Sequence, residues 1–369
     1  MPPGRHRRVR LGTSTSRAGL VGAIGVSLLA ATVLTVGALY RHQSTPAPAT
    51  TVTRRLPTTT TSTVATTQPV PSLSADGSYA VGTTSLSIME PGAPGVGDRS
   101  LPTAIFYPVR DIAAARGPDA PPDRIHAPYP LLVFSQGYDL SVQAYSTLLT
   151  DWASAGFVVA APTYPHTDPS DQRSLDENDI TNHPADLRYV ITTLLEAAQG
   201  SGSPLSGLID ANEIGAVGHS DGADVTLAVA ADTCCQDPRV KAAAILSGAE
   251  LASFGGRYAF SGRVPLLITQ GNADTINFPT CSAQIYNAAA SPKYYLDLLG
   301  APHEAPYAAP GPDQQIVAQV TTDFFDAEIA GQSAALAAMA TAGNVGGRTS
   351  LTTGPVAPQA TGACPGAPG

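Results

Sequence analysis

A serine lies within the pentapeptide Gly218-His219-Ser220-Asp221-Gly222, which fits the Gly-x-Ser-x-Gly pattern of nucleophilic serines. The chain contains 35 glycines, so a pattern this short can also arise by accident. A nucleophilic serine requires a buried strand before it, a helix after it, and an acid and then a histidine later in the chain. The pentapeptide therefore suggests nucleophilic catalysis, and its surroundings decide whether that chemistry is possible.

The residues around Ser220 supply the first part of that context. Ile214, Ala216 and Val217 form a short buried-strand pattern, and the run ADVTLAVAA after the serine is typical of a helix. A sharp turn between the two would hold the serine in a strained conformation that lifts its hydroxyl above the sheet edge. Glycines at positions 218 and 222 would let strand and helix approach each other. We therefore expect a strand, a turn and a helix at this serine.

A serine hydroxyl needs a base to accept its proton, and the base needs an acid to orient it. Of seven histidines, His303 alone follows Ser220, in a loop after the last predicted strand. Two acids compete for the third place. Asp274 follows a predicted strand through a glycine turn, and Glu250 follows the strand before that one. We favour Asp274, which would hold the imidazole in one tautomer and stabilise the imidazolium ion.

Stabilisation of a tetrahedral oxyanion requires two N–H donors. One is expected from Asp221, the residue after the serine, and the other from the loop FSQGYDLS, where the Tyr138 amide is the favoured donor. The Asp221 carboxylate would disfavour an oxyanion unless its side chain points away or is paired. Gln136, His166 and His219 are candidate pocket residues, although packing or local hydrogen bonding is the favoured role for both histidines.

These side chains require a framework, and residues 76–340 predict a single α/β-hydrolase catalytic domain. Short apolar runs alternate with longer amphipathic ones, which indicates about eight strands in a mostly parallel sheet flanked by helices. The predicted strands are 83–89, 103–109, 130–135, 156–162, 213–219, 240–247, 264–270 and 293–299. The predicted helices are 141–155, 183–199, 220–232, 280–290 and 312–330.

The two ends of the chain differ from this domain. Residues 1–17 are basic, and residues 18–40 run for 23 positions without a charge, which favours an uncleaved transmembrane anchor with a cytoplasmic N-terminus. Val36-Gly37-Ala38 would also serve as a cleavage site, in which case the protein would be secreted. Residues 41–75 indicate a Thr/Pro-rich disordered stalk, and residues 341–369 a flexible Gly/Ala/Pro-rich tail. Both interpretations place the catalytic domain outside the cytoplasm.

Charge and cysteine content narrow the class of partner. All eight basic residues before Asp76 are arginines, and no acidic residue precedes Asp76. The remainder therefore carries 12 basic and 29 acidic residues and would repel nucleic acid.

Four cysteines suit an oxidising compartment. Adjacent Cys234 and Cys235 rarely bond to each other, so we expect one of them to pair with Cys281 or Cys364, with the connectivity open. The sequence lacks Cys-x-x-Cys spacing, and we expect neither a metal nor a cofactor.

The chain resembles the α/β-hydrolase superfamily, and within it the branch of platelet-activating-factor acetylhydrolases, chlorophyllases and polyester hydrolases. Four segments carry the likeness, in order: LLVFSQGYDLS, DWASAGFVVAAPTYPH, IDANEIGAVGHSDGAD and TTDFFDAEIAGQSAAL. The resemblance covers roughly residues 80–340. It implies Ser220 as nucleophile, Asp274 as acid and His303 as base, with the Tyr138 and Asp221 amides as oxyanion donors.

The sequence thus predicts an extracytoplasmic serine hydrolase that cleaves lipid-like, small or extended carboxylic esters through an acyl-enzyme, acts as a monomer, and is held at the membrane by its N-terminal helix. An amidase, a peptidase or an acyltransferase could use the same three residues. A surface-anchored binding module on an inactive hydrolase scaffold is a further alternative. Because the sequence contains no long insertion after the sixth predicted strand, we expect a fairly open cleft at Ser220.

Overall fold

The structure, a computed structural model, describes residues 79–92, 97–110, 118–169, 175–262, 264–357 and 364. The predicted cytoplasmic segment, membrane anchor and stalk (1–17, 18–40 and 41–75) lie outside these residues. In the part of the chain that is described, no helix combines the length and the apolar character needed to cross a bilayer. The described residues all fall within one unit, Thr67–Gly369.

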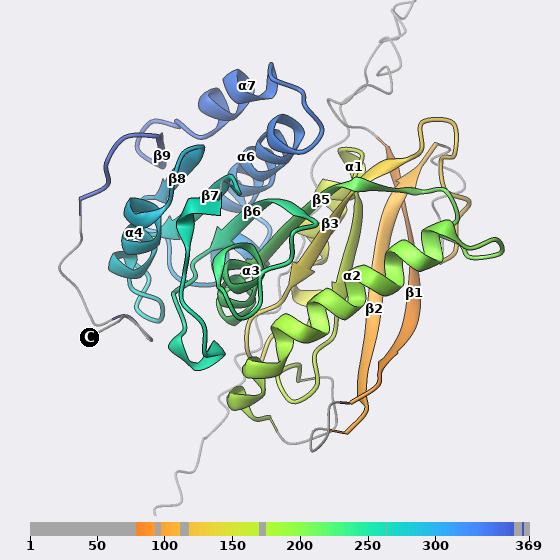
Figure 1. Ribbon diagram of the computed structural model, residues 1–369. Helices are drawn as coiled ribbons and strands as arrows, with labels where there is room; N and C mark the ends of the chain where they lie inside the picture. The colour runs from red at the N-terminus through yellow and green to blue at the C-terminus, as the bar shows by residue number, and fades with distance from the viewer. Residues whose placement is uncertain are drawn as a thin grey trace, which may run out of the picture. The chain divides into compact units, whose positions relative to one another are not determined.

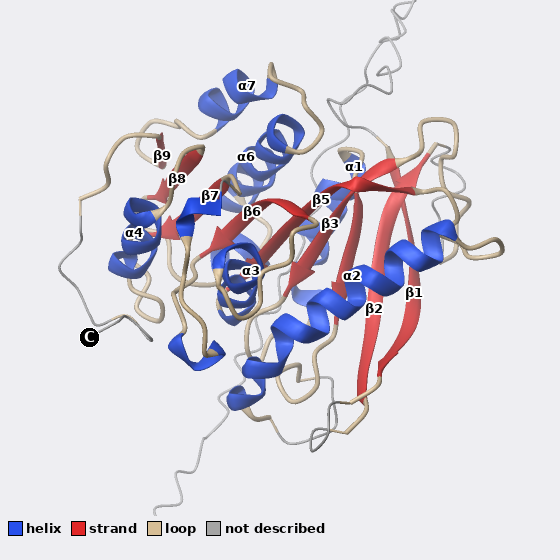
Figure 2. Ribbon diagram, in the orientation of Figure 1, coloured by secondary structure: helices blue, strands red, loops and turns tan. Residues whose placement is uncertain are grey.

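A nine-stranded mixed sheet forms the centre of this unit, in the order β1-β2-β4-β3-β5-β6-β7-β8-β9 (Figures 1 and 2). Strands β3 to β8 are parallel, whereas β1, β2 and β9 pair antiparallel with their neighbours at the two sides of the sheet. The strands are β1 (Ala80–Glu90), β2 (Arg99–Val109), β3 (Tyr129–Ser135), β4 (Val158–Pro162), β5 (Ile209–His219), β6 (Val240–Leu246), β7 (Leu266–Gly271), β8 (Lys293–Leu298) and β9 (Thr349–Thr352).

Helices cover both faces of the sheet, because successive side chains of a strand point to opposite faces and both sets here are apolar. In β3, Leu132 and Phe134 pack with the side of α1 and α6, while Leu131 and Val133 pack with the side of α2 and α3. The helices of the first face are α1 (Ser146–Ser154), α6 (Pro312–Glu328) and, beside α6, α7 (Ala335–Ala342). Those of the second are α2 (His183–Gln199), α3 (Asp221–Ala231) and α4 (Pro279–Ala288).

Short helices complete the described elements: η1 (Val142–Tyr145), η2 (Glu177–Asn182), η3 (Ala252–Phe254), η4 (Phe260–Gly262) and α5 (Ala305–Ala308). The predicted α/β class is confirmed, and the eight predicted strands correspond to β1 to β8. One expectation needs correction, because part of the predicted flexible tail, 341–369, forms β9, which pairs with β8. A four-residue strand among glycines and threonines is too short to produce a recognisable pattern.

The cysteines pair differently from the expectation. Cys234 bonds to its neighbour Cys235, and Cys281 of α4 bonds to Cys364. Tight backbone hydrogen bonding around Asp232 turns the chain after α3 and brings the two adjacent sulfurs together: its carbonyl accepts from Cys235 N–H and its carboxyl from Cys234 N–H. The second disulfide attaches the C-terminal segment to the domain. Sequence separation alone cannot reveal either pairing.

A buried ion cluster fixes η2, which later forms one wall of the site. Arg99 of β2, 7% exposed, donates two hydrogen bonds of 2.6 Å to Asp186 of α2 and bonds of 3.0 and 2.7 Å to Asp179 of η2. Burial opposes the charge of Arg99, but the bonds to both aspartates outweigh burial and raise its pKa. The planar guanidinium group matches two carboxylates at once, so η2 is held against β2 and α2.

Candidate active site

Ser220 stands between the end of β5 and the first residue of α3, where sequence analysis predicts a sharp turn. Its backbone has φ 55° and ψ −127°, in a region that residues with a side chain rarely occupy. Its N–H donates to Leu246 O at 3.0 Å, which fixes the turn to β6. The strained backbone is over-determined by the surrounding sheet, and it presents the hydroxyl at the carboxyl edge of the central strands.

The two glycines of the pentapeptide meet a steric demand. A Cβ at Gly222 would lie 2.0 Å from Ser135 O, and one at Gly218 would lie 2.1 Å from Gly222 O. Both distances are far below van der Waals contact with backbone atoms that cannot move aside. Glycine is therefore required at both positions for α3 to approach β3 and β5 this closely.

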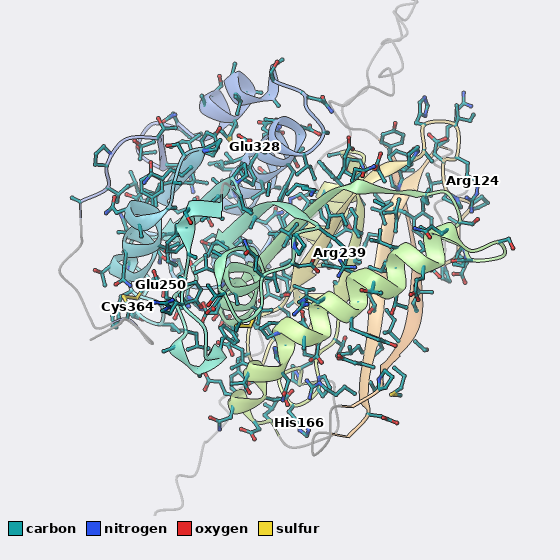
Figure 3. The ribbon with its side chains drawn as sticks, viewed as in Figure 1. Arg124, His166, Arg239, Glu250, Glu328 and Cys364 are labelled. Carbon is teal, nitrogen blue, oxygen red and sulfur yellow. A yellow bond between two sulfur atoms is a disulfide. The ribbon has the colours of Figure 1, made fainter. Side chains whose placement is uncertain are left out.

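Three side chains from separate loops meet at this edge. His303 Nε2 lies 2.8 Å from Ser220 Oγ, and His303 Nδ1 lies 2.7 Å from Asp274 Oδ2. Asp274 follows β7 and His303 follows β8, so parallel strands deliver both residues to the edge that carries the serine. The competing acid Glu250, labelled in Figure 3, has no hydrogen bond to His303 in the described structure. Of the two candidates, it is Asp274 that contacts the imidazole.

Asp274 is held as a buried carboxylate, 3% exposed. Its Oδ1 accepts the Ile276 and Asn277 N–H groups at 2.9 and 3.1 Å, and its Oδ2 accepts Gln270 Nε2 at 3.0 Å in addition to the His303 bond. Burial by itself would raise the pKa of this carboxyl, but the His303 hydrogen bond and charge, with the other donors, lower it below its usual value. Asp274 is therefore an ionised acceptor that fixes the imidazole ring.

A second hydrogen-bond chain joins the loop after β3 to His303. Gly137 N–H donates to Tyr145 Oη at 3.2 Å, Tyr145 Oη lies 2.8 Å from His219 Nδ1, and His219 Nε2 lies 3.0 Å from His303 O. A carbonyl oxygen accepts only, so His219 carries its proton on Nε2 and accepts the Tyr145 hydroxyl proton on Nδ1. Burial lowers the pKa of His219 to about 3 and keeps the ring neutral in this one tautomer.

The cavity at Ser220 has a volume of about 410 Å³. Ser220 stays partly exposed, as expected for an open cleft, with η2 as one wall. The cavity is lined by Tyr138, Leu140, Glu177, Asn178, Ile180, Thr181, Ser220, Asp221, Asp224, Leu251, Ser253, Ile276, Asn277, His303 and Glu304. Of the residues expected at the site, Tyr138 and Asp221 thus lie in its wall. Neither of their backbone N–H groups has a hydrogen-bond acceptor among the described residues.

The three candidate pocket residues do not line this cavity. His219 is fully buried in the hydrogen-bond chain described above. Gln136 is 2% exposed, and with its amide oriented to suit its neighbours it donates to Pro162 O at 2.8 Å and accepts from Tyr164 N at 3.2 Å. His166, labelled in Figure 3, lies in the loop after β4, where its carbonyl accepts Asp176 N–H. Gln136 therefore joins the end of β3 to the end of β4. The sequence does not reveal this role, because Gln136 stands next to Gly137 in the loop expected to supply an oxyanion donor.

Carboxyl groups dominate the polar wall of the cavity, which contains Glu177, Asp221, Asp224 and Glu304. Burial raises the pKa of Asp221 to about 7, with the negative charge of Glu177 as the second cause. Asp221 Oδ2 is buried without a hydrogen-bond partner in the described part of the chain. Asp224 is 5% exposed, its Oδ1 accepts Ala249 N–H at 2.6 Å, and burial raises its pKa well above the usual value.

An apolar groove of about 600 Å³ adjoins the cavity at His303. Its lining comprises Leu140, Ala144, Thr275, Ile276, Pro302, His303, Glu304, Ala305, Ala308 and Ala309. Ser220 and Asp221 do not belong to it, whereas both hollows are lined by Leu140, Ile276, His303 and Glu304. The imidazole therefore stands at the boundary between an acidic space over the serine and an apolar space along α5.

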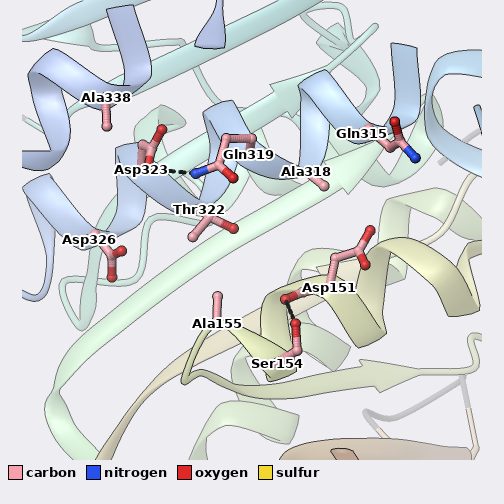
Figure 4. A pocket seen from close by; sticks show the side chains of 10 residues that line it. All are labelled: Asp151, Ser154, Ala155, Gln315, Ala318, Gln319, Thr322, Asp323, Asp326 and Ala338. Atoms are coloured by element: carbon pink, nitrogen blue, oxygen red, sulfur yellow. Dashed lines mark hydrogen bonds between the residues drawn. The ribbon is translucent and has the colours of Figure 1, made fainter. Parts of the chain in front are cut away.

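A third hollow lies between α1 and α6, away from the serine (Figure 4). Asp151, Asp323 and Asp326 line it, and the figure shows Gln319 donating to Asp323. No histidine, cysteine or strained residue lines this groove. Among the described residues there is also no group of three or more potential ligands with the geometry to hold a metal ion.

A strained serine at a strand-to-helix turn is the arrangement found at the nucleophile of α/β hydrolases. Comparison with known families agrees, since residues 120–250 match the family model described as Chlorophyllase. The match runs from before β3 to just after β6 and includes Ser220, but it ends before Asp274 and His303. No curated protein matches the chain. The resemblance to the α/β-hydrolase branch that includes chlorophyllases is confirmed, and the match supports a hydrolase.

Several residues of the site were not expected from the sequence. Tyr145 and Gln270 each orient a neighbour through buried hydrogen bonds, and Glu177 enters the cavity wall from η2. Tyr145 lies within a segment expected to be helical and Gln270 within a strand, where their residue types carry no functional signal. Glu177 lies in a short 3-10 helix that the sequence pattern does not predict. The sequence therefore gave no indication that Glu177 would line the cavity at Ser220.

Proposed function

We propose that the protein hydrolyses carboxylic esters, with Ser220 as nucleophile, His303 as general base and Asp274 as the acid that orients the base. The observation that carries the proposal is the continuous hydrogen-bond chain from Ser220 Oγ through His303 to Asp274, with distances of 2.8 and 2.7 Å, at the wall of an open cavity. A base must be within hydrogen-bond reach of the proton that it removes, and His303 meets that condition.

The reaction follows from the two ring nitrogens of His303. As Ser220 Oγ attacks the ester carbonyl carbon, its proton passes to His303 Nε2, and Asp274 stabilises the imidazolium ion through Nδ1–H. The carbonyl oxygen becomes an oxyanion that accepts hydrogen bonds from the Tyr138 and Asp221 amides. His303 then gives its proton to the leaving alcohol as the C–O bond breaks. A water molecule, deprotonated by the same imidazole, releases the acid from the acyl-enzyme.

We further propose that this chemistry takes place outside the cytoplasm, with the uncharged segment 18–40 anchoring the chain in a membrane. Two disulfides in the described domain support an oxidising compartment. The basic residues that precede the uncharged segment favour a cytoplasmic N-terminus.

A panel of para-nitrophenyl esters of graded acyl length, with the matching anilides, tests the reaction class. We expect ester hydrolysis that is abolished in Ser220→Ala, and anilide hydrolysis slower by about 100-fold or more, because the hydrolysis of an amide requires protonation of a poorer leaving group. Folded protein without activity on any ester would favour an inactive binding module. Faster cleavage of anilides than of esters would favour an amidase.

A further inference from the structure

The two hollows that meet at His303 differ in chemistry, and the proposed mechanism assigns a different half of the substrate to each. His303 protonates the leaving alcohol, so the alcohol must leave on the imidazole side. The apolar groove contacts His303 without reaching Ser220 or Asp221. The acidic cavity contains Ser220 and Asp221, the residues nearest the acyl carbon and its oxyanion. The alcohol therefore occupies the apolar groove, and the acyl chain enters the acidic cavity.

The part of the cavity that carries the carboxyls is a poor place for a neutral hydrocarbon chain, although four aliphatic side chains also line the cavity. Burying carboxyl groups against an apolar acyl chain would remove the remaining water from Asp221, whose Oδ2 already lacks a hydrogen-bond partner among the described residues. Asp224, 5% exposed, contributes a further carboxyl from the same turn of α3, and the exposed Glu177 faces them from η2. Among the residues that the structure describes, no lysine or arginine lines the cavity to balance these groups. A positively charged group would balance these carboxyls, and a protonated amine would in addition donate a hydrogen bond to Asp221.

Building on the proposed ester hydrolysis, we infer that the preferred substrate carries a cationic group, a protonated amine or quaternary ammonium, in its acyl part, and that Asp221 and Glu177 bind this group. The alcohol part is apolar and lies along α5. The Arg99 cluster supports this arrangement, because it holds η2, and with it Glu177, in a fixed position beside the cavity. Asp221 thereby has two roles, with its amide directed to the oxyanion and its carboxyl to the cation.

A pair of para-nitrophenyl esters measures the preference directly. One has γ-(trimethylammonio)butyric acid as its acyl part, and the other has the neutral isostere with a tert-butyl group in place of the trimethylammonium group. With each rate corrected for uncatalysed hydrolysis, we expect kcat/KM to be at least about 10-fold higher for the cationic ester, since a close pair of opposite charges contributes that much. In a second pair of esters the ammonium group is moved into the alcohol, so that a choline ester is compared with its tert-butyl isostere. For this pair we expect no preference in kcat/KM for the cationic ester.

Two variants and a control assign the preference to named carboxyls. The ratio of the two kcat/KM values should fall about 10-fold or more in Asp221→Asn, because that carboxyl is largely buried, and about 2- to 5-fold in Glu177→Gln, because Glu177 is exposed. Glu196→Gln makes the same charge change on the exposed end of α2 and should leave the ratio within about 2-fold of wild type, since solvent screens a remote charge. The ratio removes any effect that Asp221 has on both esters.

The outcomes separate this inference from the function on which it rests. Hydrolysis of both acyl esters with a ratio of one or less, or a ratio that neither carboxyl variant changes, would overturn the cation site while leaving the esterase intact. A preference for the choline ester would overturn the assignment of acyl and alcohol to the two hollows. Folded protein that hydrolyses none of the esters would overturn the proposed function, and the cation site with it.

Discussion

Two acidic hollows of almost equal volume, the cavity at Ser220 and the groove between α1 and α6, differ in how their carboxyls are satisfied. The volumes are about 410 and 430 Å³. In the groove, glutamine side chains donate to all three aspartates, Asp151, Asp323 and Asp326. In the cavity, Asp221 Oδ2 is buried without a donor in the described chain. Carboxyls and concavity alone therefore do not identify a site. The strained serine and the hydrogen-bonded histidine distinguish the cavity.

The largest effect should come from Asp274, the acid that orients His303 at the cavity. Asp274→Asn should lower kcat by about 10⁴-fold, because an amide no longer selects the His303 tautomer whose Nε2 accepts the serine proton. Asp323→Asn, the same change in the groove, serves as the matched control. Steady-state kinetics on a reactive ester measure both. A loss of less than about 10-fold in Asp274→Asn would mean that another group orients the base.

The buried Asp221 carboxyl of the cavity should also affect how the free energy of unfolding depends on pH. The pKa of Asp221 is about 7 in the folded protein and about 3.9 in an unfolded chain, so folding opposes its ionisation. The contribution of Asp221 to stability should therefore fall as pH rises from about 4 to about 7, whereas Asp221→Asn lacks this loss. We expect the variant to gain about 1–3 kcal/mol relative to wild type between pH ~4 and pH ~8 in denaturant unfolding. A constant difference across that range would contradict the raised pKa.

The hydrogen-bond chain through Tyr145 predicts a smaller effect on catalysis. Tyr145→Phe keeps the ring but removes the hydroxyl that joins Gly137 to His219, so the loop after β3 and His303 lose a shared constraint. We expect kcat to fall about 5- to 20-fold with KM nearly unchanged, because two buried hydrogen bonds are lost.

Tyr164→Phe provides the control for that variant. It removes another buried hydroxyl, which bonds to Ser135 Oγ at 2.8 Å, outside the chain to His303. Both variants should lose comparable stability in thermal unfolding, but Tyr164→Phe should change kcat by less than about 2-fold. An equal loss of kcat in the two variants would show that the Tyr145 effect is merely one of stability.

The smallest effect is expected in the groove of Figure 4. Asp323→Asn should change kcat/KM by less than about 2-fold for both cationic and neutral esters, because Asp323, although buried, lies in a groove that contains neither Ser220 nor His303. The same kinetic assays measure it. A selective loss for one of the esters would show that the groove takes part in substrate binding.

The sequence predicted the elements whose pattern is local. Strand periodicity located β1 to β8, and the positions of Asp274 and His303 after parallel strands predicted that both would reach the edge that carries Ser220. The pattern failed where long-range packing decides. The pairing of β9 with β8, the bond between Cys281 and Cys364, and the contact of Tyr145 with His219 each depend on segments brought together by the fold.

Gln136 illustrates the same limit at the site itself. Its place next to Gly137 suggested a pocket residue, but alternation along the end of β3 turns its side chain toward Pro162 and Tyr164. Asp221 shows the reverse. A carboxylate looked unsuitable beside an oxyanion, but Asp221 lies in the wall of the cavity at Ser220, where we propose that its carboxyl binds a cationic group of the substrate.

The central claim is that Ser220 is a nucleophile activated by His303, and covalent labelling tests it most directly. The purified protein is treated with a fluorophosphonate and digested, and the modified peptide is identified by mass spectrometry, with Ser220→Ala as the control. The account predicts a single adduct on Ser220, absent from the control and formed much more slowly in His303→Ala. Folded protein that remains unlabelled, or an adduct on another residue that persists in Ser220→Ala, would contradict it.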